Sequence, residues 1–201
     1  MKTKKLLLAT SLSTLLLFTA CSYTQPKNNS IDLKTEQEMK LKAMKAIKTV
    51  AGALQNTLNV KVKEGGLSNA AIFCSTHATS LSKEVSKTLD EGVKLKRITD
   101  KPRNPNSQAN DEQLVVFDEI KTKLLNGEKI DMIVKRKSSN HYQVYKPIIM
   151  SGKCLNCHGN DEKRNPEAYN IISKKYPNDK AIHYKAGDFR GAFLVDIINN
   201  D

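Results

Sequence analysis

Two cysteines and a histidine lie within five consecutive residues, Cys154-Leu155-Asn156-Cys157-His158. This C-x-x-C-H spacing is compatible with three kinds of chemistry: half of a zinc site, a thioredoxin-like redox pair, or covalent attachment of a c-type haem. Haem attachment uses all three residues, because the thiols add to the two vinyl groups and the imidazole binds the iron. The rest of the sequence decides among these uses.

The zinc and redox interpretations each leave part of the motif unexplained. A structural zinc site needs about four ligands, usually from two Cys/His pairs, and the other two cysteines, Cys21 and Cys74, do not form a second pair. A thioredoxin-like pair usually opens a helix in a βαβ unit, which this sequence lacks. Neither interpretation accounts for the histidine. The motif therefore predicts one covalent haem c, attached through Cys154 and Cys157, with His158 as an axial ligand.

The first twenty residues have the pattern of an export signal, with three early lysines and an apolar stretch that ends at Ala20-Cys21. This stretch is too interrupted for a permanent membrane span, which needs about 20 apolar residues. Cys21 follows small residues as in a bacterial lipoprotein signal, although Phe18 stands where leucine is usual. We predict a lipid on Cys21 and a location on the periplasmic side of the cell envelope, where c-type haem is assembled. The alternatives are secretion without a lipid and an uncleaved anchor.

Cys74 is the candidate for the second axial ligand. It lies in a helical stripe of apolar residues, which predicts that it faces the interior. A free thiol in an oxidising compartment is a liability unless it is buried or bonded, so Cys74 is either an ordinary core residue or a thiolate ligand of the iron. The other possible donors, with His77 as the main rival, are His77, His141, His183, Met44, Met132 and Met150.

The chain is strongly basic, with a formal net charge of +12 over 201 residues. This length suits one domain with a core rather than two. Because an exported protein does not meet nucleic acid, the charge indicates anionic lipid, an acidic protein partner or the acidic groups of a cofactor. A lysine-rich surface without a specific partner is the other interpretation.

The N-terminal half is predicted to be helical. Residues 21–38 hold the lipidated cysteine and a polar tether, and residues 39–201 form the domain. Apolar residues at helical spacing over 41–58 predict a long amphipathic helix that Gly65-Gly66 ends. A second stripe over 67–89 predicts another helix, which carries Cys74.

The C-terminal half contains the predicted strands. A strand over 93–98 and a loop rich in proline precede one more helix over 111–125. Segments 129–137 and 141–149 are rich in β-forming residues and predict a hairpin, which the C-x-x-C-H motif follows directly. A last strand is predicted over 191–198. Helices first and antiparallel strands later predict the α+β class.

Four segments together resemble a known family. They read AAIFCSTHA, KPRNPNSQAN, KPIIMSGKCLNCHG and YKAGDFRGAFLVDI, and they are similar to the single-haem, c-type, PAS-like sensor domain of bacteria, which occurs alone or ahead of histidine kinases, cyclases and chemoreceptors. The likeness spans residues 40–198. It implies a PAS-like antiparallel sheet with long N-terminal helices around one haem c. It also implies His158 on one side of the iron and Cys74, the cysteine of AAIFC, on the other.

Two arginines near the proline-rich loop are candidates for binding the haem propionates. Arg97 at the end of the strand, or Arg103 between the prolines of the loop, could hold an anionic propionate in a charge-assisted pair. The alternative is that Pro102 and Pro105 only stiffen a turn, with the arginine in solvent.

Two functions fit this set of residues. The first is a haem-based sensor of redox state or of a small ligand such as NO, in which loss of an iron ligand moves the helix that carries Cys74. Because no signalling domain follows Asp201, a protein partner is expected to receive the signal. The second is an electron carrier that docks through its basic surface. We do not expect an enzyme, because both axial positions are predicted to be filled.

Overall fold

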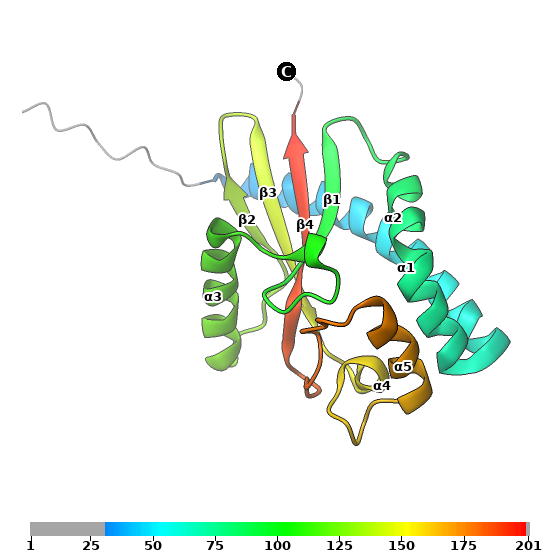
Figure 1. Cartoon of the computed structure of the whole chain (residues 1–201). Helices are drawn as coiled ribbons and strands as arrows, with labels where there is room; N and C mark the ends of the chain where they lie inside the picture. Colours follow the sequence, from blue (N-terminus) through cyan, green and yellow to red (C-terminus); the bar gives the residue numbers. More distant parts are fainter. Residues whose placement is uncertain (1–30, 200–201) are drawn as a thin grey trace, which may run out of the picture. The chain divides into compact units, whose positions relative to one another are not determined.

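The computed structural model describes residues 31–199, so Cys21 and the predicted signal peptide lie outside the described residues. The elements, shown in Figure 1, are α1 (Leu33–Thr76), α2 (Ala78–Ser86), β1 (Val93–Ile98), the 3-10 turn η1 (Pro105–Ser107), α3 (Asp111–Leu125), β2 (Ile133–Arg136), β3 (His141–Ile149), the 3-10 turn η2 (Gly152–Cys154), α4 (Leu155–His158), α5 (Pro166–Lys175) and β4 (Phe189–Ile198). A long N-terminal helix precedes an antiparallel sheet, which confirms the predicted α+β class.

The four strands form one antiparallel sheet in the order β1-β4-β3-β2. β4 is central, which explains its almost continuous apolar sequence: Val195 pairs with Leu95 on one side and with Val144 on the other. The predicted hairpin is present as β2 and β3. β1 lies at an edge, where the exposed Lys94 and Lys96 oppose pairing with another sheet.

Both faces of the sheet are covered by helices, and a hydrophobic cluster fills each interface. The first part of α1 covers one face, where the buried residues are Met39, Ala43, Ala46, Ile47, Met132, Tyr142, Val144, Val195 and Ile197. α3 covers the other, where the buried residues are Ile98, Ala109, Val116, Phe117, Ile120, Tyr145, Ala192 and Leu194. Burying these side chains supplies most of the free energy of folding. Val93 and Leu95 of β1 pack against the α1 cluster, so the alternation of the strand places Arg97 on the same side of the sheet.

α1 begins earlier than the sequence analysis predicted. The side chain of Asp32 caps the helix by accepting a 2.9 Å hydrogen bond from the backbone N–H of Thr35, and Glu36 adds a negative charge to the first turn. The boundary predicted between tether and domain at residue 38 is therefore wrong, because residues 33–38 are helical. The tether residues 21–30 lie outside the described part of the chain.

α1 is kinked at the predicted Gly65-Gly66 position. Gly66 has φ 67° and ψ −162°, a combination that is essentially restricted to glycine. The kink divides α1 into a first arm, residues 33–64, and a second arm, residues 67–76, which carries Cys74. The helix predicted over 67–89 is divided at His77, whose φ of −115° separates α1 from α2.

The Gly66→Ala variant is expected to lose about 1–3 kcal/mol of unfolding free energy, because alanine strains this backbone conformation. No atom lies within 4 Å of a Cβ added at Gly66, so the loss reports backbone strain alone. Gly52 is the matched control: it has equal space and ordinary helical geometry, so Gly52→Ala is expected to gain about 0.5–1 kcal/mol. Urea unfolding followed by circular dichroism measures both. Equal changes in the two variants would contradict the expected strain.

α5 was not predicted. Asn165 caps it by accepting a 2.9 Å hydrogen bond from the backbone N–H of Ala168, and Pro166 occupies its first turn. Its buried residues Ala168 and Ile172 pack against Ala71 on the second arm of α1. This contact fixes the second arm beside the C-x-x-C-H segment. No helix within residues 31–199 is both long and apolar enough to cross a membrane.

Candidate functional site

The C-x-x-C-H motif lies on a short turn and helix that directly follow the sheet. Cys154 ends η2, and Cys157 and His158 lie in the four-residue helix α4. Both cysteines are partly buried, but against different clusters. Cys154 packs against Met150, Ala181 and Tyr184, and Cys157 packs against the Ala71, Ala168 and Ile172 cluster between α1 and α5. The motif therefore bridges the sheet end of the domain and the second arm of α1.

The ring of His158 is held in one orientation. Its Nδ1 lies 2.7 Å from the backbone oxygen of Ala181, and because a carbonyl only accepts, Nδ1 carries the proton and Nε2 keeps its lone pair. Nη2 of Arg103 lies 3.3 Å from the same Nδ1, which is a contact between two donors and not a hydrogen bond. Burial and the positive charges of Arg103 and Arg190 lower the pKa of His158 well below its usual value. The ring is therefore neutral, as metal ligation requires.

Arg103 holds the motif in place. Its Nε donates to Oδ2 of Asp179 at 2.9 Å, and its Nη2 donates to the backbone oxygen of Cys157 at 2.7 Å. Its side chain is only 14% exposed, so the interpretation that this arginine stays in solvent is wrong. These contacts show a structural role that the sequence analysis did not predict. They do not support the predicted role of Arg103 in binding a propionate.

Asp179 connects the two supports of the motif. Besides pairing with Arg103, its carboxylate accepts a 2.8 Å hydrogen bond from the backbone N–H of Ala181, the residue whose carbonyl orients His158. The Asp179 side chain is 1% exposed. One buried carboxylate thus fixes both the Cys157 carbonyl, through Arg103, and the His158 ring, through Ala181.

Cys74 is an exposed thiol beside this motif, so the prediction that it faces the interior is wrong. It lies one turn after Ala71, which packs against Cys157. Desolvation, and next the charge of Cys157, raise the pKa of Cys74, whereas Arg97 and Arg103 act to lower it. Solvent nevertheless reaches the Cys74 side chain. The sulfur is thus accessible and close to the motif.

His77, the rival donor, faces a different part of the molecule. Its Nδ1 lies 2.6 Å from Oγ1 of Thr76, and its ring lines a cavity of about 710 Å³ that includes neither Cys74 nor any residue of the motif. The other lining residues are Thr57, Lys61, Asn69, Ile72, Phe73, Ser80, Leu81 and Glu84. Among the remaining candidates, Met44 and Met132 pack in the core, and His141 contacts Asp196 at 3.1 Å.

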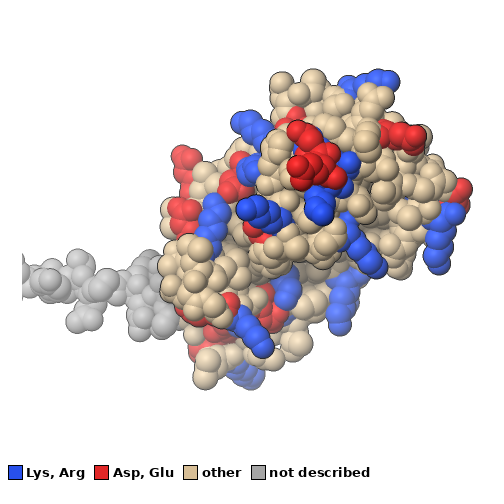
Figure 2. All heavy atoms as spheres, turned by 90° about the horizontal axis from the view of Figure 1, so that it is seen from below, with Lys and Arg blue, Asp and Glu red and all other residues tan. Residues whose placement is uncertain are grey.

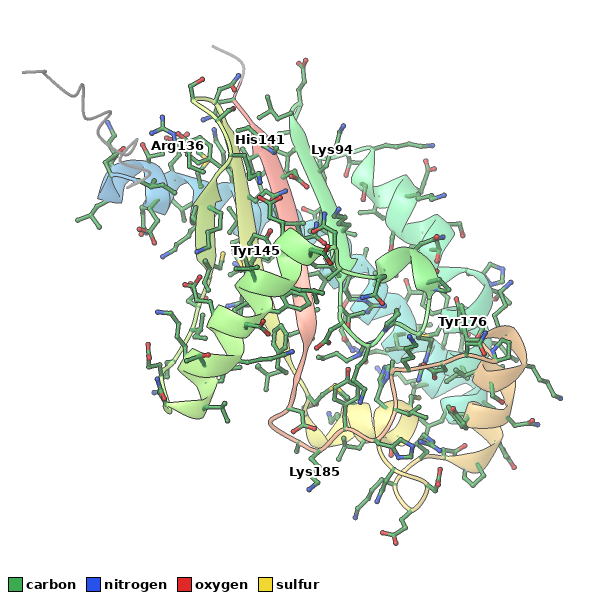
Figure 3. All side chains as sticks on the ribbon, turned by 60° about the vertical axis from the view of Figure 1, so that its left-hand side comes forward. Lys94, Arg136, His141, Tyr145, Tyr176 and Lys185 are labelled. Carbon is green, nitrogen blue, oxygen red and sulfur yellow. The ribbon has the colours of Figure 1, made fainter. Side chains whose placement is uncertain are left out.

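Three arginines gather around the motif: Arg97, Arg103 and Arg190. Arg97 is exposed, and yet desolvation lowers its pKa, while Cys74 acts to raise it. Burial likewise lowers the pKa of Arg190, with Arg97 and Arg103 acting in the same direction. Figure 3 shows Tyr176 at the end of α5, and its phenol, when ionised, acts to raise the pKa of Arg97. Arg190 is a site residue that the sequence analysis missed, although it lies in the quoted segment YKAGDFRG.

Comparison with known proteins places the chain in a family. The family model described as Tll0287-like (Tll0287) matches residues 28–197. The chain belongs to the Tll0287-like family. A similar solved structure is the crystal structure of the cyanobacterial heme-protein Tll0287, with 19% identity and a TM-score of 0.56, covering 85% of this chain and 99% of that chain. At this identity the likeness shows a shared Tll0287-like fold. No curated protein matches the chain.

Proposed function

We propose that the protein binds one haem c covalently through Cys154 and Cys157, with His158 as an axial ligand of the iron. The observation that carries this proposal is the hydrogen bond from Nδ1 of His158 to the carbonyl of Ala181. It leaves the lone pair on Nε2 of a neutral ring free to bind iron, in the same short segment as two thiols. Membership of the Tll0287-like family and the description of its structural relative as a heme-protein support it. When bound, such a haem supplies one-electron redox chemistry and small-ligand binding.

Cys74 is proposed as the second axial ligand, as a thiolate. Its sulfur is exposed and close enough to Cys157 for their charges to interact. Desolvation raises the pKa of Cys74, but Arg97 and Arg103 act to lower it and so favour the negative charge that a thiolate ligand requires. Arg97 is proposed as a partner for a haem propionate. With two side chains on the iron, no catalytic role is proposed.

The proposed role is sensing of redox state or of a small ligand such as NO. Cys74 lies on the second arm of α1, after the glycine kink, and the first arm, before the kink, packs on the sheet. A change of the bond to Cys74 therefore acts on a helix that is jointed at a glycine kink. Lipidation of Cys21 would hold this domain at a membrane on the periplasmic side, and a protein partner would receive the signal.

Electron transfer without signalling is the second candidate. Figure 2 shows lysine and arginine side chains spread over the face seen from below, with acidic side chains among them. Such a surface suits transient docking to a redox partner. A carrier keeps both iron ligands in both oxidation states, whereas a sensor exchanges one of them.

Mass spectrometry and absorption spectroscopy of the full chain, produced beside cytochrome c maturation enzymes, test the proposal. We expect a mass increase of one haem and a pyridine haemochrome spectrum typical of c-type attachment. The Cys154→Ala/Cys157→Ala double variant is the matched control and is expected to carry no covalent haem. A colourless wild-type protein with the mass of its polypeptide and lipid would overturn the proposal. Exchange of an axial ligand on reduction, or with NO, would favour the sensor over the carrier.

A further inference from the structure

The hydroxyl of Tyr184 lies close to the side chains of Thr99 and Arg190, but it meets the geometry of a hydrogen bond with no group of residues 31–199, although its side chain is almost fully buried. Tyr184 is 6% exposed, and its hydroxyl oxygen is among the few buried polar atoms of residues 31–199 that lack a partner. The ring lies edge-on to His158, with 6.4 Å between ring centroids. A buried hydroxyl without a partner costs about 1–3 kcal/mol. Its position therefore indicates an acceptor that the polypeptide does not supply.

The nearest polar groups cannot accept this proton. Oγ1 of Thr99 donates to the Arg190 carbonyl at 2.8 Å and accepts from Nη1 of Arg190 at 2.7 Å and from the backbone N–H of Lys101 at 3.1 Å. Its one proton and both lone pairs are thus used. The guanidinium of Arg190 has only donors. Tyr184 and Arg190 therefore both present hydrogen-bond donors without an acceptor between them.

The same region carries more positive than negative charge. Of the three neighbouring arginines, only Arg103 has an ionic partner within residues 31–199, which is Asp179. Arg190 uses Nη1 alone, to Thr99 and to the Lys101 carbonyl, and within residues 31–199 Arg97 forms neither a hydrogen bond nor an ion pair. The acidic group that acts on Tyr184, Asp100, is paired with Lys121 at 2.7 Å. Among the described residues, the half-buried Arg190 and the exposed Arg97 thus have no counter-charge.

We infer that Arg190 and Tyr184, together with Arg97, bind a carboxylate, and that this carboxylate is a propionate of the proposed haem. The inference rests on the proposed function and adds Arg190 and Tyr184 to its cofactor-binding residues. A guanidinium and a phenol offer several donors to a carboxylate, and charge-assisted bonds of this kind are stronger than neutral ones. The carboxylate accepts a hydrogen bond from the Tyr184 hydroxyl, and its negative charge also neutralises Arg190. Arg103 stays with Asp179.

The potential and vibrational spectrum of the haem-loaded protein test this inference. Tyr184→Phe removes only the hydroxyl, and Arg190→Gln removes the charge. In both variants the propionate is less neutralised, which favours ferric iron, so we expect the midpoint potential to shift to more negative values. We also expect the propionate bending band of the resonance Raman spectrum to move, because its frequency responds to hydrogen bonding.

Two control variants make the same chemical changes elsewhere. Arg136 lies at the other end of the sheet from α4 (Figure 3), where it donates to the carbonyls of Ser138 and Ser139. Tyr142 is a buried tyrosine in the cluster on the α1 face. Arg136→Gln and Tyr142→Phe are expected to leave the Raman band and the potential unchanged. If Arg190→Gln fails to fold, the Raman band and the potential of Tyr184→Phe still test the inference.

Three results would have distinct meanings. Unchanged Raman band and potential in Tyr184→Phe and Arg190→Gln, with haem attached, would overturn this inference and leave the proposed function intact. A wild-type potential that depends on added acetate at constant ionic strength, and loses this dependence in Arg190→Gln, would identify a site for solution anions and overturn the assignment to a propionate. A wild-type protein without haem would remove the proposed function itself.

Discussion

The Cys74→Ala variant of the haem-loaded protein is expected to lose the spectrum of a thiolate-ligated, low-spin iron while it keeps its covalent haem. Cys154, Cys157 and His158 are unchanged in this variant, so attachment and one axial bond remain. Cys74 is exposed, so truncation leaves no core cavity and costs less than about 0.5 kcal/mol of stability. Absorption and EPR spectra of purified protein, with the mass as a check on attachment, measure the effect.

His77→Ala is the matched control for this prediction. His77 lies three residues after Cys74, but it lines the separate cavity between α1 and α2. We expect its spectra to equal those of the wild type. If His77→Ala changed the spectrum and Cys74→Ala did not, thiolate ligation would be wrong and the iron would take its second ligand from His77. A Cys74→His variant provides a further check, because it is expected to show bis-histidine ligation.

Local patterns in the sequence predicted the elements whose signals are strong over a short stretch. The apolar run of β4, the spacing of α3 and the glycine pair at the kink each act within a few neighbouring residues, and the structure has all three. α5 was missed although Asn165 and Pro166 are a good start signal. The reason is its short apolar stripe, in which Ala168 and Ile172 become buried only because Ala71 of α1 packs on them.

The contacts that build the candidate site could not be predicted from local patterns. Arg103 and Asp179 are 76 positions apart, and only the fold of the loops around the sheet brings them together. The exposure of Cys74 also depends on tertiary structure. Its stripe is apolar, but α5 covers the helix at Ala71 and leaves Cys74, one turn later, exposed. Spacing predicted which residues could do chemistry, whereas the surroundings that tune them come from distant segments.

The buried pair of Arg103 and Asp179 is expected to be the largest single electrostatic contribution to the stability of the site. Asp179→Asn keeps the shape of the side chain and an oxygen for the N–H of Ala181, but it leaves Arg103 without a counter-charge beside two other arginines. Breaking a buried pair in this way costs about 3–5 kcal/mol, out of a typical total of about 5–15 kcal/mol. Urea unfolding of the full-length protein is expected to show a loss of this size.

Two further variants separate charge burial from other causes. Glu84 pairs with Lys87 at 2.7 Å, but both side chains are 72% exposed, so Glu84→Gln is expected to cost less than about 1 kcal/mol. The Asp179→Asn/Arg103→Leu double variant removes both buried charges and is expected to be more stable than Asp179→Asn alone, because the buried guanidinium of Arg103, which lost its partner in the single variant, is also removed. If the double variant were the less stable of the two, the hydrogen bond from Arg103 to the Cys157 carbonyl would outweigh the charge effect. In that case Arg103 would support the C-x-x-C-H segment chiefly as a hydrogen-bond donor.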